Sequence, residues 1–287
     1  TARTVPVKPF VALQHARYTT AEACFTAVAR HCQDTQLDFL DGVCFAPEEL
    51  YLTLGRFTDA APYTSDYTFE HIYYRSIRER ASDFLKVRDF LWRWDTDWFW
   101  CSKNVGAQNP ILRRLYGRKR LNSITYQKIM RWNSRHGFTR AWSRFRGVTP
   151  ESVIQDVDIP LPRAAEFLEF FHAEVGILPV WICPILAPPA SERFPLYPLK
   201  PDALYVNFGF WDVVADRTPR APGWYNRKIE RKVDALSGIK SLYSDSYFTS
   251  DEFWSIYDRD AYRALKARYD PKGTLGDLYD KTVKRAR

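Results

Sequence analysis

Motifs that bind nucleotide phosphates are missing from this sequence. Glycine is scarce, with 12 in 287 residues, and neither GxGxxG nor GxxxxGK[ST] occurs. Both motifs use glycine to bring main-chain N–H groups close to phosphate oxygens. The sequence therefore does not encode a nucleotide-binding domain of the ordinary type.

Metal-binding and disulfide patterns are missing as well. The five cysteines show no CxxC spacing, and the five histidines form no HxH or HExxH pattern. An odd number of scattered cysteines is typical of buried thiols in a reducing compartment. We therefore expect free cysteines, no metal site and a cytoplasmic protein, with peripheral attachment to a membrane as an open alternative.

Long apolar runs and an initiator methionine are absent. No run approaches the roughly 20 apolar residues of a membrane-spanning helix. The first ten residues lack the apolar region of a signal peptide. Met130 is the single methionine, and the chain begins with Thr1. From this start we expect a fragment or a processed product.

Acidic residues are absent from Trp98 to Pro150, whereas the whole chain has a net charge of +8. The same stretch contains many Lys and Arg residues, of which the most closely spaced are Arg113, Arg114, Arg118, Lys119 and Arg120. We expect these five to form a surface for a membrane or a partner. Six of the ten tryptophans lie in or just before the stretch: Trp92, Trp94, Trp98, Trp100, Trp132 and Trp142.

Three interpretations of this basic aromatic region remain open. Trp and Arg together suit an anionic membrane interface. Single-stranded nucleic acid, the less favoured interpretation, also uses aromatic rings and cations. In the third, the tryptophans form the core of a helical insertion and the arginines cover its solvated face.

The hydrophobic pattern predicts two similar halves around an insertion. Residues 8–59 indicate strand, helix, strand and strand. Residues 152–270 indicate strand, helix, two strands, helix, a last strand over 241–248 and a last helix over 250–270. The insertion, about 63–148, reads as mainly helical. Helices beside an antiparallel or mixed sheet make an α+β fold.

Several segments follow one another in an order known from one protein family. They are "KPFVALQHARY", "LDFLDGVCFAPEELYLTLGRFTD", "QNPILRRLYG", "IQDVDIPLPRAAEFLEFF", "PVWICPILAPP", "ALYVNFGFWD", "LYSDSYFTSDEFW" and "YDPKGTLGDLYDK". Single motifs among them are weak, but five or more in register are specific. Over essentially its whole length, the chain resembles the delta-24 sterol reductases.

That resemblance implies a flavoprotein of the vanillyl-alcohol oxidase and p-cresol methylhydroxylase superfamily. Residues 1–287 would be its C-terminal substrate (cap) domain, and the tail 267–287 would pack toward an N-terminal FAD domain outside this sequence. The chain alone would then be inactive. The implied reaction is hydride transfer between FAD and a hydrophobic, sterol- or lipid-like substrate, with NADPH as the donor for a reductase. The alternative is a non-catalytic lipid- or RNA-binding module with a basic aromatic surface.

The best candidates for catalytic residues lie in "LYSDSY". Tyr243, Asp245 and Tyr247 alternate along the predicted last strand, so they would share one face. A tyrosine there can donate a proton while Asp245 orients it. The alternative is a solvated strand end with a tyrosine packed beneath a helix.

Two other strands supply candidates for substrate or cofactor contacts. Gln155 lies in "QDVDIP", and Tyr205, Asn207 and Gly209 share one face of "YVNFGFW", where a glycine would allow a ring to approach. Sheet packing is the alternative for each. Relative to the family, "FLWRWDT" replaces "YYHRHTR" and "YVNFG" replaces "YIDIG", so a histidine and a carboxylate are missing, the latter at Asn207.

Overall fold

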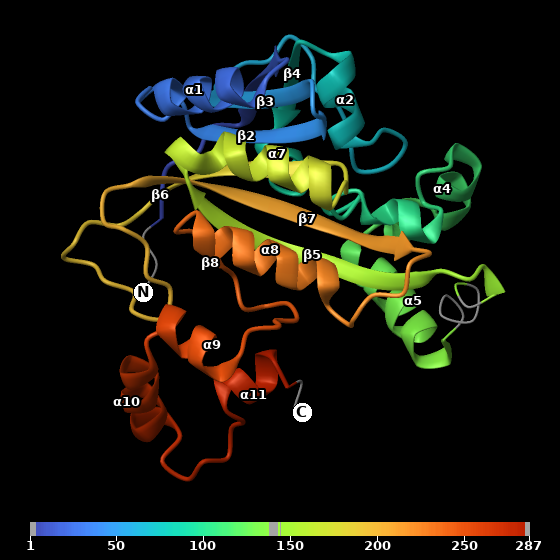
Figure 1. Ribbon diagram of the computed structural model, residues 1–287. Coiled ribbons are helices and arrows are strands. Elements are labelled where there is room, and N and C mark those ends of the chain that lie inside the picture. The colour runs from blue at the N-terminus through green and yellow to red at the C-terminus, as the bar shows by residue number, and fades with distance from the viewer. Residues whose placement is uncertain (1–3, 138–142, 144, 285–287) are drawn as a thin grey trace. The chain divides into compact units, whose positions relative to one another are not determined.

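The computed structural model describes residues 4–137, 143 and 145–284. The chain divides into two compact units, Thr1–Pro150 (unit 1) and Glu151–Arg287 (unit 2). Each unit contains strands of a β-sheet with helices packed against it (Figure 1). The predicted α+β class is therefore confirmed, whereas the assignment as a cap domain stays a prediction.

Unit 1 contains four strands in the order β4-β1-β3-β2. Each neighbouring pair is antiparallel. The three strands predicted in residues 8–59 are confirmed. The predicted insertion also contributes a strand, because β4 falls inside it and pairs with β1. The bounds are β1 Phe10–Tyr18, β2 Phe39–Ala46, β3 Glu49–Thr58 and β4 Ser82–Lys86.

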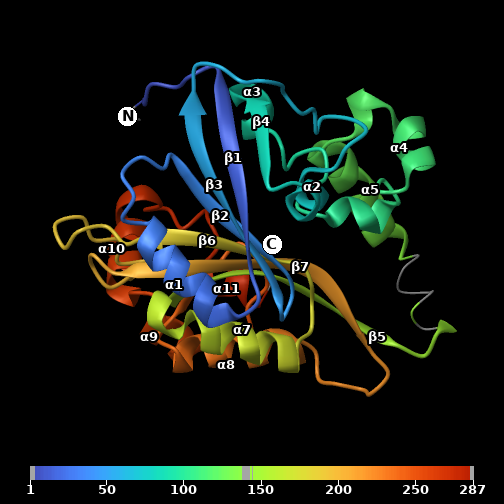
Figure 2. The same cartoon turned by 90° about the horizontal axis from the view of Figure 1, so that it is seen from above.

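Helix α1 (Ala21–His31) packs on β1 and β3 of unit 1 (Figure 2). The Thr20 side chain accepts a hydrogen bond from the main-chain N–H of Ala23, which satisfies a donor that a helix N-terminus otherwise leaves unpaired. Cys24 and Val28 lie on its buried face. The helix predicted from the capping signal is confirmed.

The predicted insertion is mainly helical in its described part. Its helices are α2 Tyr73–Glu79, α3 Val87–Leu91, α4 Pro110–Tyr116 and α5 Ser123–His136. Trp94 and Trp100 are buried, so the core interpretation holds for them, whereas Trp92 and Trp132 are exposed. Trp142, Arg140 and Arg144 lie outside the described residues.

Unit 2 contains four strands in the order β6-β7-β5-β8. Helices α7 (Ala164–Glu174) and α8 (Trp224–Ala235) cover one face of this sheet (Figure 2). Between α7 and β7, the rings of Phe171 and Phe210 lie 4.4 Å apart, so the even-numbered residues of β7 face the helices. The bounds are β5 Thr149–Pro160, β6 Val180–Leu186, β7 Leu204–Asp216 and β8 Ile239–Lys240.

The C-terminal helix predicted over 250–270 is two helices, α9 (Ser250–Ile256) and α10 (Arg259–Tyr269). Tyr257 between them is extended, and the Asp258 side chain caps α10. In the tail, α11 (Leu278–Thr282) places Tyr279 against Phe253 of α9, with ring centroids 5.3 Å apart. One side of the tail therefore packs within unit 2, and its packing toward an FAD domain stays a prediction.

A fully buried ion pair lies beneath the end of the unit 2 sheet. Lys240 Nζ lies 3.0 Å from Glu230 Oε1, and both side chains have no exposed surface. The ammonium also donates to the carbonyl of Asp245 and to Ser246 Oγ, and the Glu230 carboxylate accepts from the N–H of Tyr247. Burial raises the pKa of Glu230 and lowers that of Lys240, while each partner opposes the shift of the other.

Removing one member of this pair will cost stability. In Lys240→Met, the buried Glu230 loses its closest cation, a change that typically costs about 3–5 kcal/mol. Arg227, 3.7 Å from the same carboxylate, stays in place, so we expect a loss at the lower end of that range. Urea denaturation of Lys228→Met gives the matched control, because Lys228 also lies on α8 but its ion pair with Glu174 of α7 is partly exposed, and the loss of that pair should cost less than about 1 kcal/mol. Equal losses in the two variants would show that the buried pair does not hold unit 2 together.

A buried polar row crosses three strands of unit 1. His15 of β1 pairs across the sheet with Thr53 of β3, which pairs with Asp41 of β2. His15 Nδ1 lies 2.9 Å from Thr53 Oγ1, and Arg93 binds Asp41 at 2.8 Å and covers the ring of Tyr73. Burial lowers the pKa of His15 to about 4, although Asp41 raises it in part.

The pKa of His15 predicts that the protein loses stability in mild acid. The unfolded chain binds a proton near pH 6.5 and the folded chain only near pH 4, so the free energy of unfolding falls as the pH drops between these values. The full loss is about 3 kcal/mol. His15→Gln lacks this contribution, so the stability difference between it and the parent should shrink toward pH 4. A pH-independent difference would contradict a neutral, buried His15.

Candidate functional site

The face of the unit 2 sheet opposite α7 and α8 contains a cluster of polar and aromatic side chains. Strand alternation turns the odd-numbered residues of β7 and the even-numbered residues of β5 toward it. Loop residues from either side add hydroxyl groups. We call this cluster the polar face; it comprises Asp156, Asp158, Tyr197, Asn207, Trp211, Ser241 and Tyr243.

Asp158 is the better-satisfied carboxylate of the polar face. The Tyr197 hydroxyl donates to its Oδ2, and the Asn207 amide donates to its Oδ1, each at 2.7 Å. Burial raises the pKa of Asp158, and both hydrogen bonds oppose that shift. At position 207, where the resemblance implies a carboxylate, the amide of Asn207 binds the neighbouring carboxylate of β5.

Asp156 lies two residues before Asp158 and has fewer partners. The Tyr243 hydroxyl hydrogen-bonds to its carboxylate, and Trp211 Nε1 donates to the same hydroxyl at 3.1 Å. Its Oδ1 is buried and has no hydrogen-bond partner among the described residues. Burial raises the pKa of Asp156 to about 6, and Asp158 adds to the shift while the Tyr243 bond opposes it. Asp156 can therefore hold or release a proton near neutral pH.

The segment that contains Tyr243 is not a strand, so the predicted strand over 241–248 is wrong. Lys240 and Glu230 bind main-chain groups of Asp245 and Tyr247, which fixes an irregular turn. Tyr243 and Asp245 are exposed, and the Tyr247 ring packs against Gly223 at the start of α8. The predicted shared face of the three residues is thus wrong, and only Tyr243 joins the polar face through described contacts.

The other residues predicted to contact substrate or cofactor do not all lie on the same face of the sheet. Gln155 is fully buried on the helix side of β5, where it donates to Asn226 of α8 at 2.6 Å. Tyr205 accepts a hydrogen bond from the main chain of Lys200. A ring does approach Gly209, but it is the indole of Trp211, which a Cβ there would meet at 2.5 Å. A role for these three in substrate contact stays a prediction.

Four of the five residues predicted to form a basic surface are exposed, and the fifth, Arg113, is not. Arg113 is buried, and its guanidinium donates to the carbonyls of Phe69, Ala107 and His71. Its assignment to a membrane or partner surface is therefore wrong, because a helix of the insertion uses it internally. The other four members are exposed, and two of them form ion pairs, Arg114 with Glu70 and Arg118 with Asp66.

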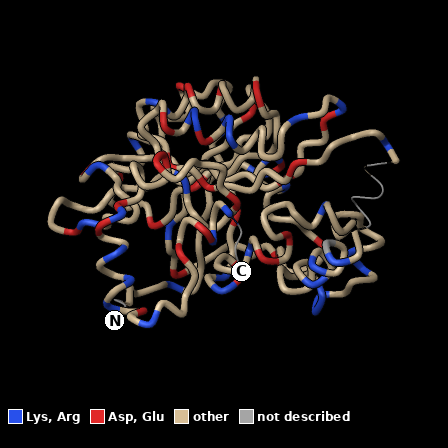
Figure 3. The backbone as a smooth tube through the Cα atoms, turned by 60° about the horizontal axis from the view of Figure 1, so that its bottom comes forward, with Lys and Arg blue, Asp and Glu red and all other residues tan. Residues whose placement is uncertain are grey.

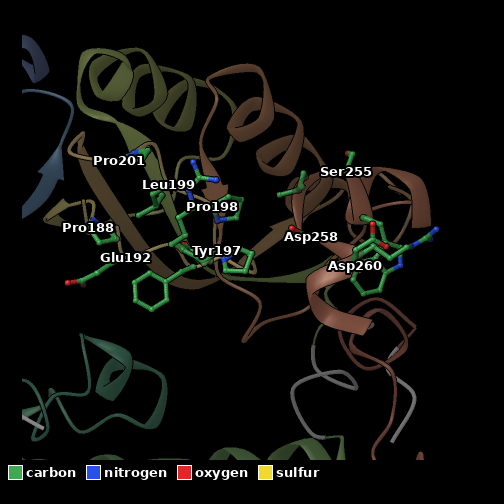
Figure 4. A pocket seen from close by; sticks show the side chains of 15 residues that line it. Pro188, Glu192, Tyr197, Pro198, Leu199, Pro201, Ser255, Asp258 and Asp260 are labelled. Atoms are coloured by element: carbon green, nitrogen blue, oxygen red, sulfur yellow. The ribbon is translucent and has the colours of Figure 1, made fainter. Parts of the chain in front are cut away.

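A cavity of about 720 Å³ borders the polar face. It lies between the proline-rich loop before β7 and the corner between α9 and α10 (Figure 4). Its wall includes Phe194, Leu199 and Trp254, and Tyr197 is shared between this wall and the polar face. Its other lining residues include five with charged side chains: Glu192, Arg193, Asp258, Arg259 and Asp260. The cavity therefore offers an apolar wall to a hydrophobic molecule, with polar groups beside it that could orient the molecule.

Sequence reasoning missed Asp156, Asp158, Tyr197 and Trp211. A signal was available for the two aspartates, since "QDVDIP" places both carboxylates on one face of a strand. Cys24 and Cys44 are buried as expected, but Cys32 is exposed; none of the five cysteines forms a disulfide bond. Among the described residues no three His, Cys, Asp or Glu side chains are arranged to hold a metal ion, and no helix has the length and apolar character needed to cross a membrane.

The hydrogen bond from Tyr243 predicts a measurable change in the titration of Asp156. Tyr243→Phe removes a bond that stabilises the ionised carboxylate, so the pKa of Asp156 should rise above its value of about 6. The pH dependence of the Asp156 carboxyl ¹³C shift measures it. Tyr197→Phe is the control, since it should raise the pKa of Asp158 instead. An unchanged Asp156 titration in Tyr243→Phe would show that the two groups do not interact.

The comparisons with known proteins agree with the resemblance found in the sequence. The chain is 24% identical over 299 residues to the delta(24)-sterol reductases of Mus musculus and Homo sapiens, which covers 99% of this chain and 55% of each relative. It is also 24% identical over its whole length to a delta(24)-sterol reductase homolog of Caenorhabditis elegans. No family model matches. The chain is thus similar to delta(24)-sterol reductases and spans about half of their length.

Proposed function

We propose that this chain is the substrate (cap) domain of an FAD-dependent oxidoreductase similar to delta(24)-sterol reductases. The support is a similarity that extends over 99% of the chain, together with the polar face beside a cavity that has a partly apolar wall. The substrate would be hydrophobic and sterol- or lipid-like. FAD would be bound mainly by an N-terminal domain of the same protein, because this chain has no glycine-rich loop for the diphosphate.

The polar face fits a role beside a flat cofactor ring. Tyr243 is 56% exposed and Trp211 is partly exposed. Both rings lie near Asp156, whose pKa is raised to about 6. We infer that these two side chains would face the flavin ring and the substrate. Bound FAD would supply or accept the hydride at its N5 atom. This chain would therefore have to bind the substrate, exclude water and handle a proton.

Within this proposal, the arrangement of Asp156, Tyr243 and Trp211 is the single observation that carries the proton transfer. Reduction of a carbon–carbon double bond places a hydride on one carbon and a proton on the other. The Tyr243 hydroxyl would give that proton, and the Trp211 N–H would stabilise the phenolate oxygen through its 3.1 Å hydrogen bond. Protonated Asp156 would then return a proton to Tyr243, which its pKa of about 6 permits.

The cavity bordering the polar face would hold the apolar body of the substrate. Phe194 and Trp254 provide apolar wall, while Tyr197 connects the cavity to Asp158. A hydrophobic molecule bound there would place one end near the two aspartates. NADPH as the electron donor, like the direction of the reaction, stays a prediction from the resemblance.

Turnover by the natural full-length protein loaded with FAD tests the proposal. With a sterol that has a double bond at C24, Tyr243→Phe should slow the half-reaction that involves the substrate by about 100-fold, because the proton donor is lost. FAD content and stability should stay near the parent values, since the tyrosine is exposed. Tyr63→Phe, a change at an exposed tyrosine of unit 1, is the matched control and should leave the rate unchanged.

Two outcomes would contradict the proposal. Full activity in Tyr243→Phe would assign the tyrosine to packing and leave the proton to another group. Absence of any flavin half-reaction with sterols in the parent, together with retained lipid or RNA binding, would favour the non-catalytic module instead.

A further inference from the structure

We propose that α4 and the cations around it dock this protein on an anionic lipid bilayer. Helix α4 turns three aliphatic side chains to the solvent: Ile111 is 71% exposed, Leu112 43% and Leu115 72%. Residues 111 and 115 are four apart, so they lie on one face of the helix. Aliphatic residues exposed together on a short helix mark a surface that normally has a partner.

The inner side of α4 is firmly held, so its outward apolar face is a fixed feature. The buried guanidinium of Arg113 donates to three main-chain carbonyls of neighbouring segments. The Tyr116 hydroxyl donates to the carbonyl of Val105 at 3.0 Å, and its ring contacts Tyr126 of α5. Asn109 caps the N-terminus through two main-chain N–H groups. These contacts fix which side of α4 faces outward.

Exposed cations lie on α4, in the turn after it and on α5; of these, Arg114 and Arg118 are paired with Glu70 and Asp66. Lys119 and Arg120 follow α4 directly, and Lys128 lies on α5; all three are exposed and form no ion pair within the described part of the chain. In Figure 3 the α4–α5 part of the chain, at the right of the view, shows blue Lys and Arg with little red. The sequence from Trp98 to Pro150 contains no acid that would repel an anionic surface.

The kinds of side chain exposed favour a bilayer over nucleic acid. Proteins that bind single strands stack bases on exposed aromatic rings. Here Trp94, Trp100 and Tyr126 are buried, and the exposed group on α4 is aliphatic. The exposed indoles are those of Trp92 and Trp132, and tryptophan is also enriched at membrane interfaces. Aliphatic residues that enter the acyl boundary, with cations at the headgroup level, are instead the pattern of a protein lying on an anionic membrane. Docking would bring the protein to the compartment where a hydrophobic substrate dissolves.

Co-sedimentation with vesicles tests this inference without flavin or substrate, so its result does not depend on the proposed chemistry. The protein should bind phosphatidylcholine vesicles that contain phosphatidylserine, and the binding should fall as salt increases. The double variant Ile111→Ser/Leu115→Ser should lower the partition coefficient about tenfold or more. Lys119→Glu/Arg120→Glu should lower it to a similar extent and weaken the salt dependence.

Matched controls place the effect on α4. Leu265→Ser removes an exposed leucine from helix α10, and Arg217→Glu reverses an exposed charge in unit 2; neither should change binding. Circular dichroism and urea denaturation of each variant establish that the fold is retained. Equal binding to vesicles without phosphatidylserine, binding that survives both double variants, or preferential binding of a single-stranded RNA oligonucleotide would each overturn the inference.

Discussion

The buried pair of Lys240 and Glu230 is the interaction on which the arrangement of unit 2 depends. Two opposite charges without exposed surface are tolerated only when both are hydrogen-bonded. Here the remaining hydrogen-bonding capacity of the two groups goes to the main chain of residues 245–247 and to Ser246. The pair thereby connects α8, the end of β8 and the turn that follows it. Tyr243 lies in that turn, so its place over Trp211 depends on the pair.

The two faces of the unit 2 sheet differ: one packs against helices, and the other contains the polar side chains of the candidate site. On the helix side, Phe167 and Phe171 of α7 pack against Phe208 and Phe210 of β7. On the other side, Asp156 and Asp158 stand two residues apart, and each is hydrogen-bonded by a tyrosine from a different loop. The two carboxylates differ because Asp158 also receives the Asn207 amide, whereas Asp156 retains a buried oxygen that has no hydrogen-bond partner in the described part of the chain. That difference makes Asp156 the group suited to proton exchange.

The strands and helices with regular periodicity could be predicted from the sequence. Runs rich in apolar and β-branched or aromatic residues in β1, β3, β5 and β7, and the capping signal of α1, each indicated the observed element. Over 241–248 the same reasoning failed, because main-chain groups there bind the side chains of Lys240 and Glu230 instead of a neighbouring strand. A two-residue period records side-chain polarity and contains no information about such partners.

The candidate site was harder to predict because its residues come from distant parts of the chain. Tyr197 and Tyr243 approach the two aspartates from loops about 40 and 85 residues away along the chain, and only the folded sheet brings them together. Arg113 was expected on the surface but is buried, because its guanidinium donates hydrogen bonds to the main-chain carbonyls of residues 69, 71 and 107. The local sequence pattern therefore predicted most helices and strands, whereas contacts between distant parts of the chain determined which residues form the candidate site.

The pH dependence of the substrate half-reaction in the full-length protein with FAD tests the central claim most directly. If protonated Asp156 supplies the proton through Tyr243, the rate should fall as the pH rises through about 6. In Asp156→Asn the residual rate should lose this dependence, because an amide does not titrate. A variant that keeps the parent profile, with the same fall near pH 6, would contradict the assignment of proton transfer to the polar face.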